Sequence, residues 1–474
     1  MQTTTKPPTQ VVIIGGGITG LSVAWELQTA HPDLKITILE KEKRWGGKVV
    51  THTAPGPNGG QFVIDGGPES FVTRKPEVWD LAHELGIEDK LFDPGSETRN
   101  MFVLDGGKPV RVPLSPIAFL TSSLMSLRGK ARLLAEPFIS PKEDDLDESL
   151  AEFAGRRLGY EASRKMVGPI LAGIYNTDPE KQSILTTSPI MREMEAEAGS
   201  LFKAAFRRMR AARKNKTNGT EKPPRFVTLA NGAQVLIDTL VEQLDADLYS
   251  GTEVQDIQTT DTGYEVVLAE GEPLQADAVI LASPANASTK LLAKAAPDAT
   301  RLLQEIPHKN IGTITLAYRQ SDLPPDLKIN GLMIPRREER LIDAVTFTTA
   351  KMPQRAPQGY VLLRVFFGGT APHLVELNQD ELCTQVQGEL AELLNIEAEP
   401  VATWPFQWLD SFPQAEVGHL NKVAEIEEVL PSGLYVTGSS YRGIGVPDCI
   451  RQGRDTATKA LHFLKSLQHE ELLV

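Results

Sequence analysis

The feature that most constrains the fold of this chain is a glycine-rich motif close to its N-terminus. Four consecutive β-branched residues, Val11 to Ile14, are typical of a parallel strand that is buried on both faces. Gly15, Gly17 and Gly20 follow in G-x-G-x-x-G spacing, and a segment with helical periodicity comes next. In this motif the glycines permit a tight turn, the close approach of a pyrophosphate and the packing of helix on strand. The phosphates then lie at the N-terminus of the helix, where the amide groups favour negative charge.

A second predicted strand, KITILE, supports this interpretation because it ends in an acidic residue at the expected distance. Glu40 lies 20 residues after Gly20, where a carboxylate accepts hydrogen bonds from a ribose hydroxyl. An acidic residue at this place favours an adenosine without a 2′-phosphate. The order strand, turn, helix, strand therefore predicts a dinucleotide site. The alternative is a glycine-rich turn that binds no ligand.

The composition limits the class of protein. The 474 residues predict about two to four domains. Cys383 and Cys449 are too few for a disulfide framework, so we expect a reducing, cytoplasmic compartment. The net charge of −13 argues against a nucleic-acid binder, which needs a basic face. The polar N-terminus shows no secretory signal, and the apolar stretches are shorter than the ~20 residues of a membrane-spanning helix.

Two further glycine pairs distinguish between the candidate cofactors. The segment KEKRWGGKVVT places Arg44 before Gly46 and Gly47, and FVIDGGPESF places Gly66 and Gly67 before a proline. Both resemble segments of the flavoprotein amine oxidase superfamily, in which the first runs along FAD and the second passes the flavin ring. A nicotinamide enzyme would need neither segment. The three elements in this order therefore favour FAD.

The resemblance also implies which residues contact the cofactor. They are Gly15, Gly16, Gly17, Ile18, Thr19, Gly20, Glu40, Lys41, Arg44, Gly46, Gly47, Lys48, Gly66, Gly67, Pro68, Glu69, Val254, Trp408, Gly438, Ser439, Ile444, Gly445 and Val446. Val254 would contact the adenine side through its backbone, and Trp408 is either a wall of the site or an ordinary core residue. Residues 395–410, where related amine oxidases carry a flavin-linked cysteine, contain none, so we expect non-covalent FAD.

The resemblance implies an α/β fold with three parts. A Rossmann-like, GR2-type FAD-binding domain is built from three separated segments, 9–90, 225–300 and 412–466. Residues 301–411 mix strands with a helix and resemble the substrate domain of the superfamily, which is a mixed β-sheet. Residues 100–222 show helical spacing and are expected to form a helical module at the substrate entry. One of the two interpretations given below makes this module membrane-facing. The stretch TNGTEKPP, residues 217–224, is the best linker candidate.

Four internal phrases point to one branch of the superfamily. ESFVTRK, LAEFAGRRLG, GPILAGIYNTDPEKQSI and YRGIGVPDCIRQG together resemble the porphyrinogen oxidases of haem synthesis, over nearly the whole chain. The branch implies that a porphyrinogen loses six electrons in three FAD cycles, each passing a hydride to flavin N5, and that dioxygen becomes hydrogen peroxide. This chemistry does not require the general-base constellation that the sequence lacks. The alternatives are another FAD oxidase acting on amines or polyenes, or a non-catalytic flavin-binding scaffold for porphyrin transfer.

The residues after the second glycine pair favour coproporphyrinogen III over protoporphyrinogen IX. Animal-type members carry arginines where this chain has Glu69 and Met101, and GGPESFVTRK instead resembles the Gram-positive type. Arg74 and Lys75 are candidates to pair with the four propionates of coproporphyrinogen III, because cations are the natural partners of carboxylates. Lys75 also matches a family position that matters for activity. The alternative is that Lys75 caps a surface turn.

The phrase GIYNTD contributes two further substrate residues by the same resemblance. Ile174 and Tyr175 would face the macrocycle in an apolar slot that fits a flat ring. Dioxygen is the implied second substrate, and a downstream chelatase that receives the porphyrin is a candidate protein partner.

The loop GSSYRGIGVPDCIRQG, residues 438–453, admits two interpretations. One is a reactive site around Cys449, and the other is the second half of the flavin site. Gly443 and Gly445 would let the backbone lie flat against the flavin, and Asp448 would cap the final helix. The amide end of that helix would then face the flavin edge that gains negative charge on reduction. Because no base lies nearby in sequence, we favour a packing role for Cys449.

Two segments are unusually basic for an acidic protein. Residues 200–216, SLFKAAFRRMRAARKNK, carry seven Lys and Arg residues without an acidic one, and residues 112–138 are apolar and locally basic. Basic amphipathic helices lie on anionic membrane surfaces. Peripheral contact with the inner face of the cell membrane and ordinary core packing are the two alternatives for both segments.

Overall fold

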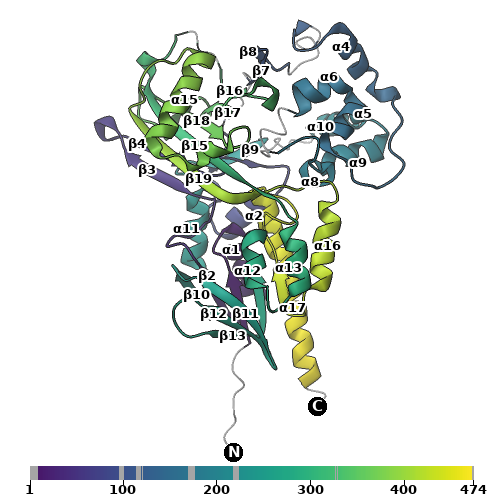
Figure 1. Cartoon of the computed structure of the whole chain (residues 1–474), viewed down its shortest axis with the longest axis vertical. Helices are drawn as coiled ribbons and strands as arrows, with labels where there is room; N and C mark the ends of the chain where they lie inside the picture. Colours follow the sequence, from purple (N-terminus) through teal and green to yellow (C-terminus); the bar gives the residue numbers. More distant parts are fainter. Residues whose placement is uncertain are drawn as a thin grey trace, which may run out of the picture.

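The computed structural model describes residues 9–94, 101–113, 119, 121–168, 177–216, 224–325, 327 and 329–471. Residues 1–8 of the polar N-terminus, nearly all of the predicted linker, and the predicted substrate residues Ile174 and Tyr175 lie outside this part of the chain. The molecule has a lower part that contains a parallel sheet, and an upper part in which a large sheet lies beside a group of helices (Figure 1).

A five-stranded parallel sheet brings together three distant parts of the chain. Its strands in spatial order are β10 (Asp247–Ser250), β2 (Lys35–Glu40), β1 (Gln10–Ile14), β14 (Ala278–Leu281) and β20 (Leu434–Val436). The side chains of β1 alternate between two cores, because Val11 and Ile13 belong to one apolar cluster and Val12 and Ile14 to the other. The predicted burial of this strand on both faces is therefore confirmed.

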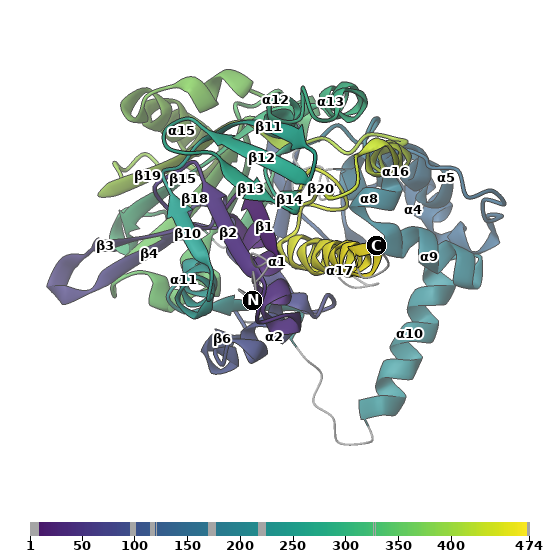
Figure 2. The ribbon, with the colours of Figure 1, turned by 90° about the horizontal axis from the view of Figure 1, so that it is seen from below.

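Helices and a small sheet cover the two faces of the parallel sheet. One apolar cluster packs against α1 (Ile18–Ala30), α2 (Glu77–Glu84), α11 (Gln234–Gln243) and α17 (Val446–Glu471). The other cluster packs against α12 (Ala285–Leu291), α13 (Pro297–Gln304), α16 (His419–Val429) and the antiparallel strands β11 (Val254–Thr260), β12 (Gly263–Leu268) and β13 (Leu274–Ala276). Helix α17 lies along α1, so the C-terminal helix covers the N-terminal glycine motif (Figure 2).

The upper part is dominated by a seven-stranded mixed sheet. Its strands in spatial order are β19 (Ala402–Pro413), β15 (His308–Arg319), β18 (Tyr360–Phe367), β17 (Ile342–Phe347), β16 (Gly331–Met333), β7 (Met101–Asp105) and β8 (Lys108–Arg111). Helix α15 (Gln379–Leu394) covers one face by burying Leu382, Val386 and Leu390. A capping box formed by Asn378 and Glu381 fixes where α15 begins.

Residues 101–111 correct the sequence-based expectation. The sequence analysis includes them in a helical region, whereas the structure places them in the edge hairpin β7–β8 of the large sheet. The turn between the strands has φ of +62° at Gly106 and +74° at Gly107, which are values that only glycine adopts without strain. The Asp-Gly-Gly sequence between two apolar runs is therefore a local hairpin signal in this sequence.

Smaller elements connect the two parts. A hairpin consists of β3 (Thr51–Pro55) and β4 (Gln61–Asp65), and a second small sheet contains β5 (Phe71–Val72), β9 (Phe226–Leu229) and β6 (Leu91–Phe92). The short helix α14 (Thr348–Lys351) and the 3-10 turn η7 (Pro353–Arg355) precede β18. These elements lie next to the segment that follows β4, which the sequence analysis assigns to the flavin.

The helical module has its own small core. Its helices are α4 (Leu127–Leu134), α5 (Leu150–Leu158), α6 (Tyr160–Ala162), α8 (Ile184–Thr187), α9 (Pro189–Ala198) and α10 (Leu201–Lys216), with the 3-10 turn η3 (Glu136–Phe138) and the π-helical turn η4 (Ser163–Val167). Leu150, Phe153 and Ile184 are fully buried in its apolar cluster. Helix α10 projects away from the rest of the module (Figure 2).

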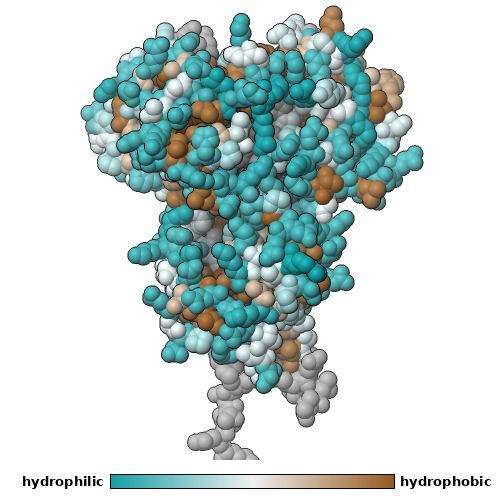
Figure 3. Space-filling view, in the orientation of Figure 1, coloured by the Kyte–Doolittle hydropathy of each residue, from teal (hydrophilic) through white to brown (hydrophobic). Residues whose placement is uncertain are grey.

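Across the described ranges, no helix combines the length and the hydropathy of a membrane span. The face of the molecule in Figure 3 is mostly hydrophilic, with small separate hydrophobic patches.

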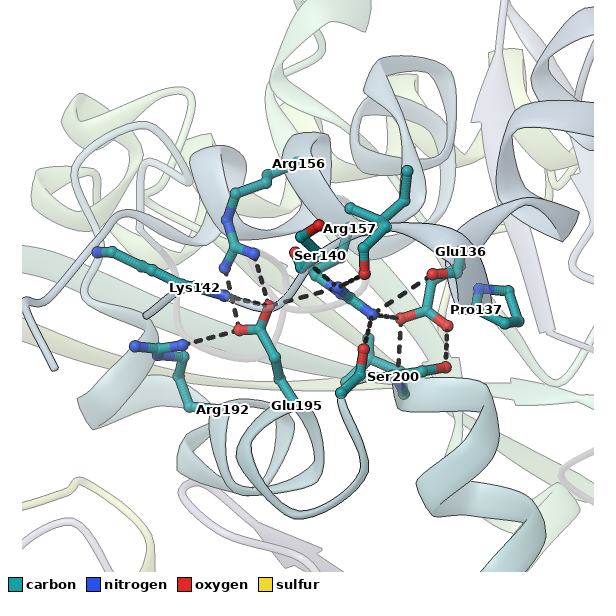
Figure 4. Close-up of polar contacts among 12 residues, drawn as sticks. Glu136, Pro137, Ser140, Lys142, Arg156, Arg157, Arg192, Glu195 and Ser200 are labelled. Carbon is teal, nitrogen blue, oxygen red and sulfur yellow. Dashed lines mark hydrogen bonds and ion pairs between the residues drawn. The ribbon is translucent and has the colours of Figure 1, made fainter. Parts of the chain in front are cut away.

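A buried ionic network holds the helical module together (Figure 4). Arg157 and Glu136, both fully buried, form an ion pair, and Glu136 also accepts hydrogen bonds from Ser200 Oγ at 2.5 Å and from the Leu201 amide at 2.9 Å. Burial alone would raise the pKa of Glu136, but the hydrogen bonds from Ser200, Leu201 and Arg157 lower it below its usual value. The network therefore ties the N-terminus of α10 to the core of the module.

A second buried ion pair connects the two parts of the molecule. Arg355 Nη1 lies 2.6 Å from Asp65 Oδ2, and neither side chain is more than 1% exposed. Arg355 also donates to Leu229 O at 2.9 Å, and Asp65 accepts hydrogen bonds from Thr51 Oγ1 and the Ala233 amide. Residues from β3, β4, β9 and η7 therefore meet at one buried carboxylate.

The buried pair predicts a large loss of stability in Asp65→Asn. The substitution keeps the shape of the side chain but leaves the Arg355 charge without its partner, which costs about 3–5 kcal/mol. Thermal and urea unfolding of the purified protein measure the loss. The control is Asp298→Asn, because the ion pair of Asp298 with Arg301 has both side chains more than 70% exposed and contributes at most about 1 kcal/mol. Equal shifts in the two variants would contradict the prediction.

Candidate functional site

The glycine turn after β1 has the geometry that the sequence predicts. Gly15 has a φ of +113°, and its amide donates to Leu39 O at 2.8 Å. A Cβ on Gly20 would lie 2.0 Å from Gly15 O, so helix and turn touch there. A Cβ on Gly17 would meet no protein atom within 4 Å. Gly20 is therefore needed by the fold itself, whereas Gly17 faces open space.

The N-terminus of α1 is free to receive an anion. Gly17 is the N-cap, no side chain caps the helix, and its first turn, which contains Ile18 and Thr19, has no acidic residue. The first amides of a helix need a partner and favour negative charge. The diphosphate of a dinucleotide supplies such a partner, so this helix end fits the predicted cofactor.

Glu40 lies at the end of β2, beside the glycine turn. Its Oε2 accepts a hydrogen bond from the Gly16 amide at 2.7 Å, and its Oε1 accepts one from the Glu42 amide at 2.8 Å. Because a carboxylate has about four acceptor positions, each oxygen keeps capacity for a ribose hydroxyl. The neighbouring Lys41 pairs with Glu253 at 2.8 Å, which raises the pKa of Lys41 and connects this edge to Val254 at the start of β11.

The second glycine element lies directly against the first. Gly46 donates to Gly16 O at 2.8 Å, and a Cβ on Gly47 would lie 3.5 Å from Gly17 Cα. Arg44 holds this turn by donating to Gly47 O at 2.6 Å. Lys48 follows, and burial lowers its pKa. The structure thus gathers the predicted residues 44–48 beside Gly17.

The third glycine element is held by the large sheet. Arg364 on β18 donates to Gly66 O and Gly67 O, each at 2.6 Å, and Thr313 on β15 donates to Gly66 O at 2.9 Å. A Cβ on Gly67 would lie 1.8 Å from Lys48 O, so Gly67 packs directly on the second glycine element. Pro68 follows these glycines in the chain. The three glycine elements are therefore in contact in sequence order.

Glu69 pairs with the same arginine. Arg364 Nη1 lies 3.5 Å from Glu69 Oε2. Burial would raise the pKa of Glu69, but the charges of Lys351, Arg364 and Arg355 outweigh it and lower the pKa below its usual value. Glu69 therefore acts as a charged anchor for Arg364, which in turn fixes the carbonyl groups of Gly66 and Gly67.

The C-terminal loop returns to the glycine motif. Gly438, just after β20, has a φ of +116°, and its Cβ would lie 3.4 Å from Thr19 Oγ1. Ser439 comes next, and the following Ser440 hydroxyl lies 3.3 Å from His308 Nε2 and accepts a hydrogen bond from the Ala285 amide at 3.1 Å. Burial lowers the pKa of His308. The loop is therefore fixed at its start by two other elements.

The start of the last helix differs from the expectation. The sequence analysis makes Asp448 the N-cap, whereas α17 begins at Val446, and the Cys449 amide already donates to Gly445 O at 2.9 Å. Asp448 is thus in the first turn, where a carboxylate is favoured by the helix dipole. Ile444 and Gly445 directly precede the helix, and Val446, also assigned to the flavin from the sequence, is its first residue.

Cys449 is a buried packing residue. It is 5% exposed within the apolar cluster of α1 and α17, and burial raises the pKa of its thiol to about 11. A thiol is nucleophilic as the thiolate, which such a pKa suppresses at neutral pH. The geometry agrees with the packing interpretation rather than with a reactive site.

The remaining predicted residues are distributed as follows. Trp408 on β19 is half-buried and stacks on Phe406, with ring centroids 6.3 Å apart. A Cβ on Gly66 would lie 2.3 Å from the Phe406 ring, so this aromatic pair borders the third glycine element. Lys75 pairs with Asp448, and its sequence neighbour Arg74 is exposed. No cluster of potential metal ligands occurs in the described ranges.

Sequence reasoning misses the residues that reach the site from the large sheet. Arg364, Thr313 and His308 lie on strands without a local motif, and their partners are far away along the chain. A buried arginine in the apolar run YVLLRVFF is the one signal that could have drawn attention to Arg364.

The parallel sheet, the three glycine elements and Glu40 together are typical of a dinucleotide-binding oxidoreductase. Its nucleotide domain is built from separated segments of the chain. The family model for flavin containing amine oxidoreductases matches residues 18–461. The coproporphyrinogen III oxidase of Bacillus subtilis (strain 168) is 31% identical over 471 residues, which cover 96% of this chain and 98% of the relative. The protoporphyrinogen oxidase 2, chloroplastic/mitochondrial, of Arabidopsis thaliana is 25% identical over 496 residues, with 98% and 96% coverage.

A solved structure agrees with these relatives. The crystal structure of a proposed protoporphyrinogen oxidase from Exiguobacterium sp. 255-15 superposes with a TM-score of 0.83 at 28% identity, covering 97% of this chain and all of that one. The chain therefore belongs to the flavin containing amine oxidoreductase family. It is an FAD-dependent oxidoreductase with the mixed α/β fold of this family.

Two glycines of the turn allow the effect of a substitution on folding to be distinguished from its effect on cofactor binding. Gly17→Ala leaves the protein folded, because no protein atom obstructs the new methyl group, but the methyl group collides with the diphosphate. A cost of about 1–3 kcal/mol corresponds to a roughly five- to 150-fold rise in the Kd for FAD. Fluorescence titration of the apoprotein with FAD measures the Kd, and circular dichroism reports the fold.

Gly20→Ala serves as the contrasting variant. Its methyl group would lie 2.0 Å from Gly15 O, so we expect a loss of stability together with a loss of FAD. If Gly17→Ala unfolds the protein, or retains FAD as tightly as the unsubstituted protein, the assignment of Gly17 to the diphosphate is wrong.

Proposed function

We propose that this protein oxidises a porphyrinogen to the porphyrin, with coproporphyrinogen III as the preferred substrate and dioxygen as the electron acceptor. The observation that carries the proposal is the similarity to the coproporphyrinogen III oxidase of Bacillus subtilis along nearly the full length of both chains. Glu69 supports the choice of substrate, since animal-type protoporphyrinogen oxidases are expected to carry an arginine at this position.

The residues of the site have separate tasks in this proposal. The amides of Gly17, Ile18 and Thr19 hold the diphosphate, and Glu40 holds the adenosine ribose. Arg364 and Thr313 fix the carbonyl groups of the 66–67 turn, which would hold this turn in place beside the flavin ring. Bound FAD supplies the two-electron oxidation and passes the electrons to dioxygen. Three such rounds remove six hydrogens from the porphyrinogen and convert three dioxygen molecules into three hydrogen peroxide molecules.

The proposal is tested by adding porphyrinogens to the purified yellow protein under air. We expect porphyrin fluorescence to rise above the autoxidation blank, about three hydrogen peroxide molecules per porphyrin, and a higher kcat/KM for coproporphyrinogen III than for protoporphyrinogen IX. Flavin released by acid identifies the cofactor as non-covalent. The Gly17→Ala apoprotein is the control.

Two outcomes would contradict this proposal. One is the absence of a fluorescence rise with both porphyrinogens, in spite of bound FAD. The other is hydrogen peroxide production from a primary amine without turnover of either porphyrinogen, which would favour the alternative of an amine oxidase.

We further propose that helix α10 makes peripheral contact with an anionic membrane. The support is a row of exposed apolar side chains, since Phe202 is 38%, Phe206 62% and Met209 50% exposed. The same helix carries Lys203 and Arg207 on an exposed surface. Such a helix lies in the headgroup region with its apolar face inserted and its cations on anionic lipid.

Two basic residues of the 112–138 segment, Lys130 and Arg132, have a different role. Lys130 is 8% exposed and donates to Ser122 O at 2.7 Å, and Arg132 donates to the carbonyl groups of Arg156 and Arg157. These cations stabilise the helical module from within. The proposal of membrane contact therefore rests on α10 and on its neighbour Phe138 in η3, which is 88% exposed.

Vesicle pelleting tests the membrane proposal. The protein should pellet with vesicles that contain anionic lipid and far less with neutral vesicles, and Phe206→Glu should weaken binding by roughly tenfold, because a charge must enter the interface. The matched control is Tyr249→Glu, which changes a 48% exposed residue on β10 in the lower part of the molecule. If both variants pellet equally well, α10 is not the contact.

A further inference from the structure

Lys75 forms an ion pair with Asp448, which no motif in the sequence predicts. Its Nζ lies 2.6 Å from Oδ1 and 2.5 Å from Oδ2 of Asp448, although the two residues are 373 positions apart. Lys75 lies just before α2, after the strand β5 that follows the third glycine element. Asp448 lies in the first turn of α17. The ion pair thus joins the N-terminal and C-terminal parts of the flavin site.

The carboxylate of Asp448 packs directly on the predicted flavin loop. A Cβ on Gly443 would lie 2.9 Å from Asp448 Cγ, and a Cβ on Gly445 would lie 3.0 Å from Asp448 Oδ2. One turn further along α17, Gln452 accepts a hydrogen bond from the Arg442 amide at 2.8 Å and donates to Gly443 O at 3.0 Å. The first turns of α17 therefore hold the whole 442–445 loop in place.

The charges around Asp448 explain why it needs a cation. Its side chain is only 12% exposed, and a nearly buried carboxylate is costly without a partner. Arg451 lies 3.5 Å away, farther than Lys75. The Lys75 ammonium, 34% exposed, supplies the close neutralising charge. Without it, the Asp448 carboxylate would keep only the more distant Arg451 as a cationic partner beside the loop.

We propose that Lys75 is a positioning residue of the flavin site, which acts through Asp448 to hold the 443–445 loop against the cofactor, and is not a ligand of the substrate carboxylates. The inference rests on the placement of FAD at this loop, which the proposed function also uses. The Lys75 ammonium already lies within 2.6 Å of both Asp448 oxygens, so a substrate propionate would have to share it with a paired and nearly buried carboxylate.

A double-mutant cycle on the FAD-loaded protein tests this inference. The variants are Lys75→Met, Asp448→Asn and the double substitution, and the readouts are the Kd for FAD of the reconstituted apoprotein and the reduction potential of the bound flavin. Each single variant should weaken FAD binding by roughly tenfold, and the double variant by little more than either, because both remove the same interaction. Lys75→Arg keeps the pair and should restore the Kd to within about threefold.

A matched control and a substrate readout distinguish the alternatives. Lys459→Met breaks a 3.0 Å ion pair between Lys459 on α17, whose side chain is 55% exposed, and Glu427 on α16, and it should leave the Kd for FAD unchanged. If Lys75→Met leaves the Kd and the potential unchanged and raises only the KM for the porphyrinogen, Lys75 is a substrate ligand and the inference is wrong. Additive effects of the two single variants would also overturn it.

The FAD titration needs no porphyrinogen, so the two proposals fail separately. A protein that does not turn over porphyrinogens, but shows the non-additive Kd pattern, refutes the proposed function and keeps the role of Lys75. If Lys75→Met does not fold, the other two variants still test the role of Lys75. The inference requires that Lys75→Arg binds FAD normally and that Asp448→Asn binds FAD more weakly.

Discussion

Two buried arginines that contact the flavin segment, Arg355 in η7 and Arg364 on β18 of the large sheet, are the constraint on which the arrangement of this protein depends. Arg355 ends in a fully buried ion pair with Asp65, and Arg364 binds the carbonyl groups of Gly66 and Gly67. A buried guanidinium without a partner is very unfavourable. Each arginine therefore requires residues 65–67 to stay where their carboxylate and carbonyl groups can pair with it. These two contacts fix the position of the large sheet relative to the nucleotide domain. Residues 65–67, which they hold, belong to the segment that we assign to the flavin.

The nucleotide-binding half of the site could be predicted from the sequence because its physics is local. Gly15, Gly20 and Glu40 act through backbone geometry and through neighbours that a short motif specifies. The same is true of Gly67, whose Cβ position is filled by Lys48 O. Where the space around a backbone position allows only glycine, the spacing of glycines in the sequence is enough to predict that position.

The rest of the site could not be predicted, because its contacts are long-range. Arg364 and His308 reach the site from strands whose sequences show only burial, and the partner of Lys75 comes from the other end of the chain. The prediction for residues 101–111 fails for another reason, since the Gly106–Gly107 turn is a local signal that was overlooked in favour of the surrounding helical spacing. The cap role expected for Asp448 fails by three residues, because α17 begins at Val446 and continues the turn that starts at Gly445.

The helical module shows why charge counts alone do not reveal a surface. Arg157 and Glu136 are fully buried in the module, and Arg156 bridges Glu148 and Glu195. These charged side chains therefore form ion pairs inside the module instead of a charged surface. Helix α10 carries the opposite combination, with apolar side chains exposed to solvent and its N-terminus tied to the buried network. For residues 200–216 the sequence left membrane contact and core packing open, and the structure shows Phe202, Phe206 and Met209 exposed on α10.

The most direct measurement of the central claim is rapid mixing of the oxygen-free, FAD-loaded protein with coproporphyrinogen III. The account predicts that the flavin absorbance bleaches at a rate that saturates with substrate, and that dioxygen restores the absorbance while porphyrin fluorescence appears. A flavin that stays oxidised in the presence of coproporphyrinogen III and protoporphyrinogen IX, but bleaches with an amine, would contradict the account.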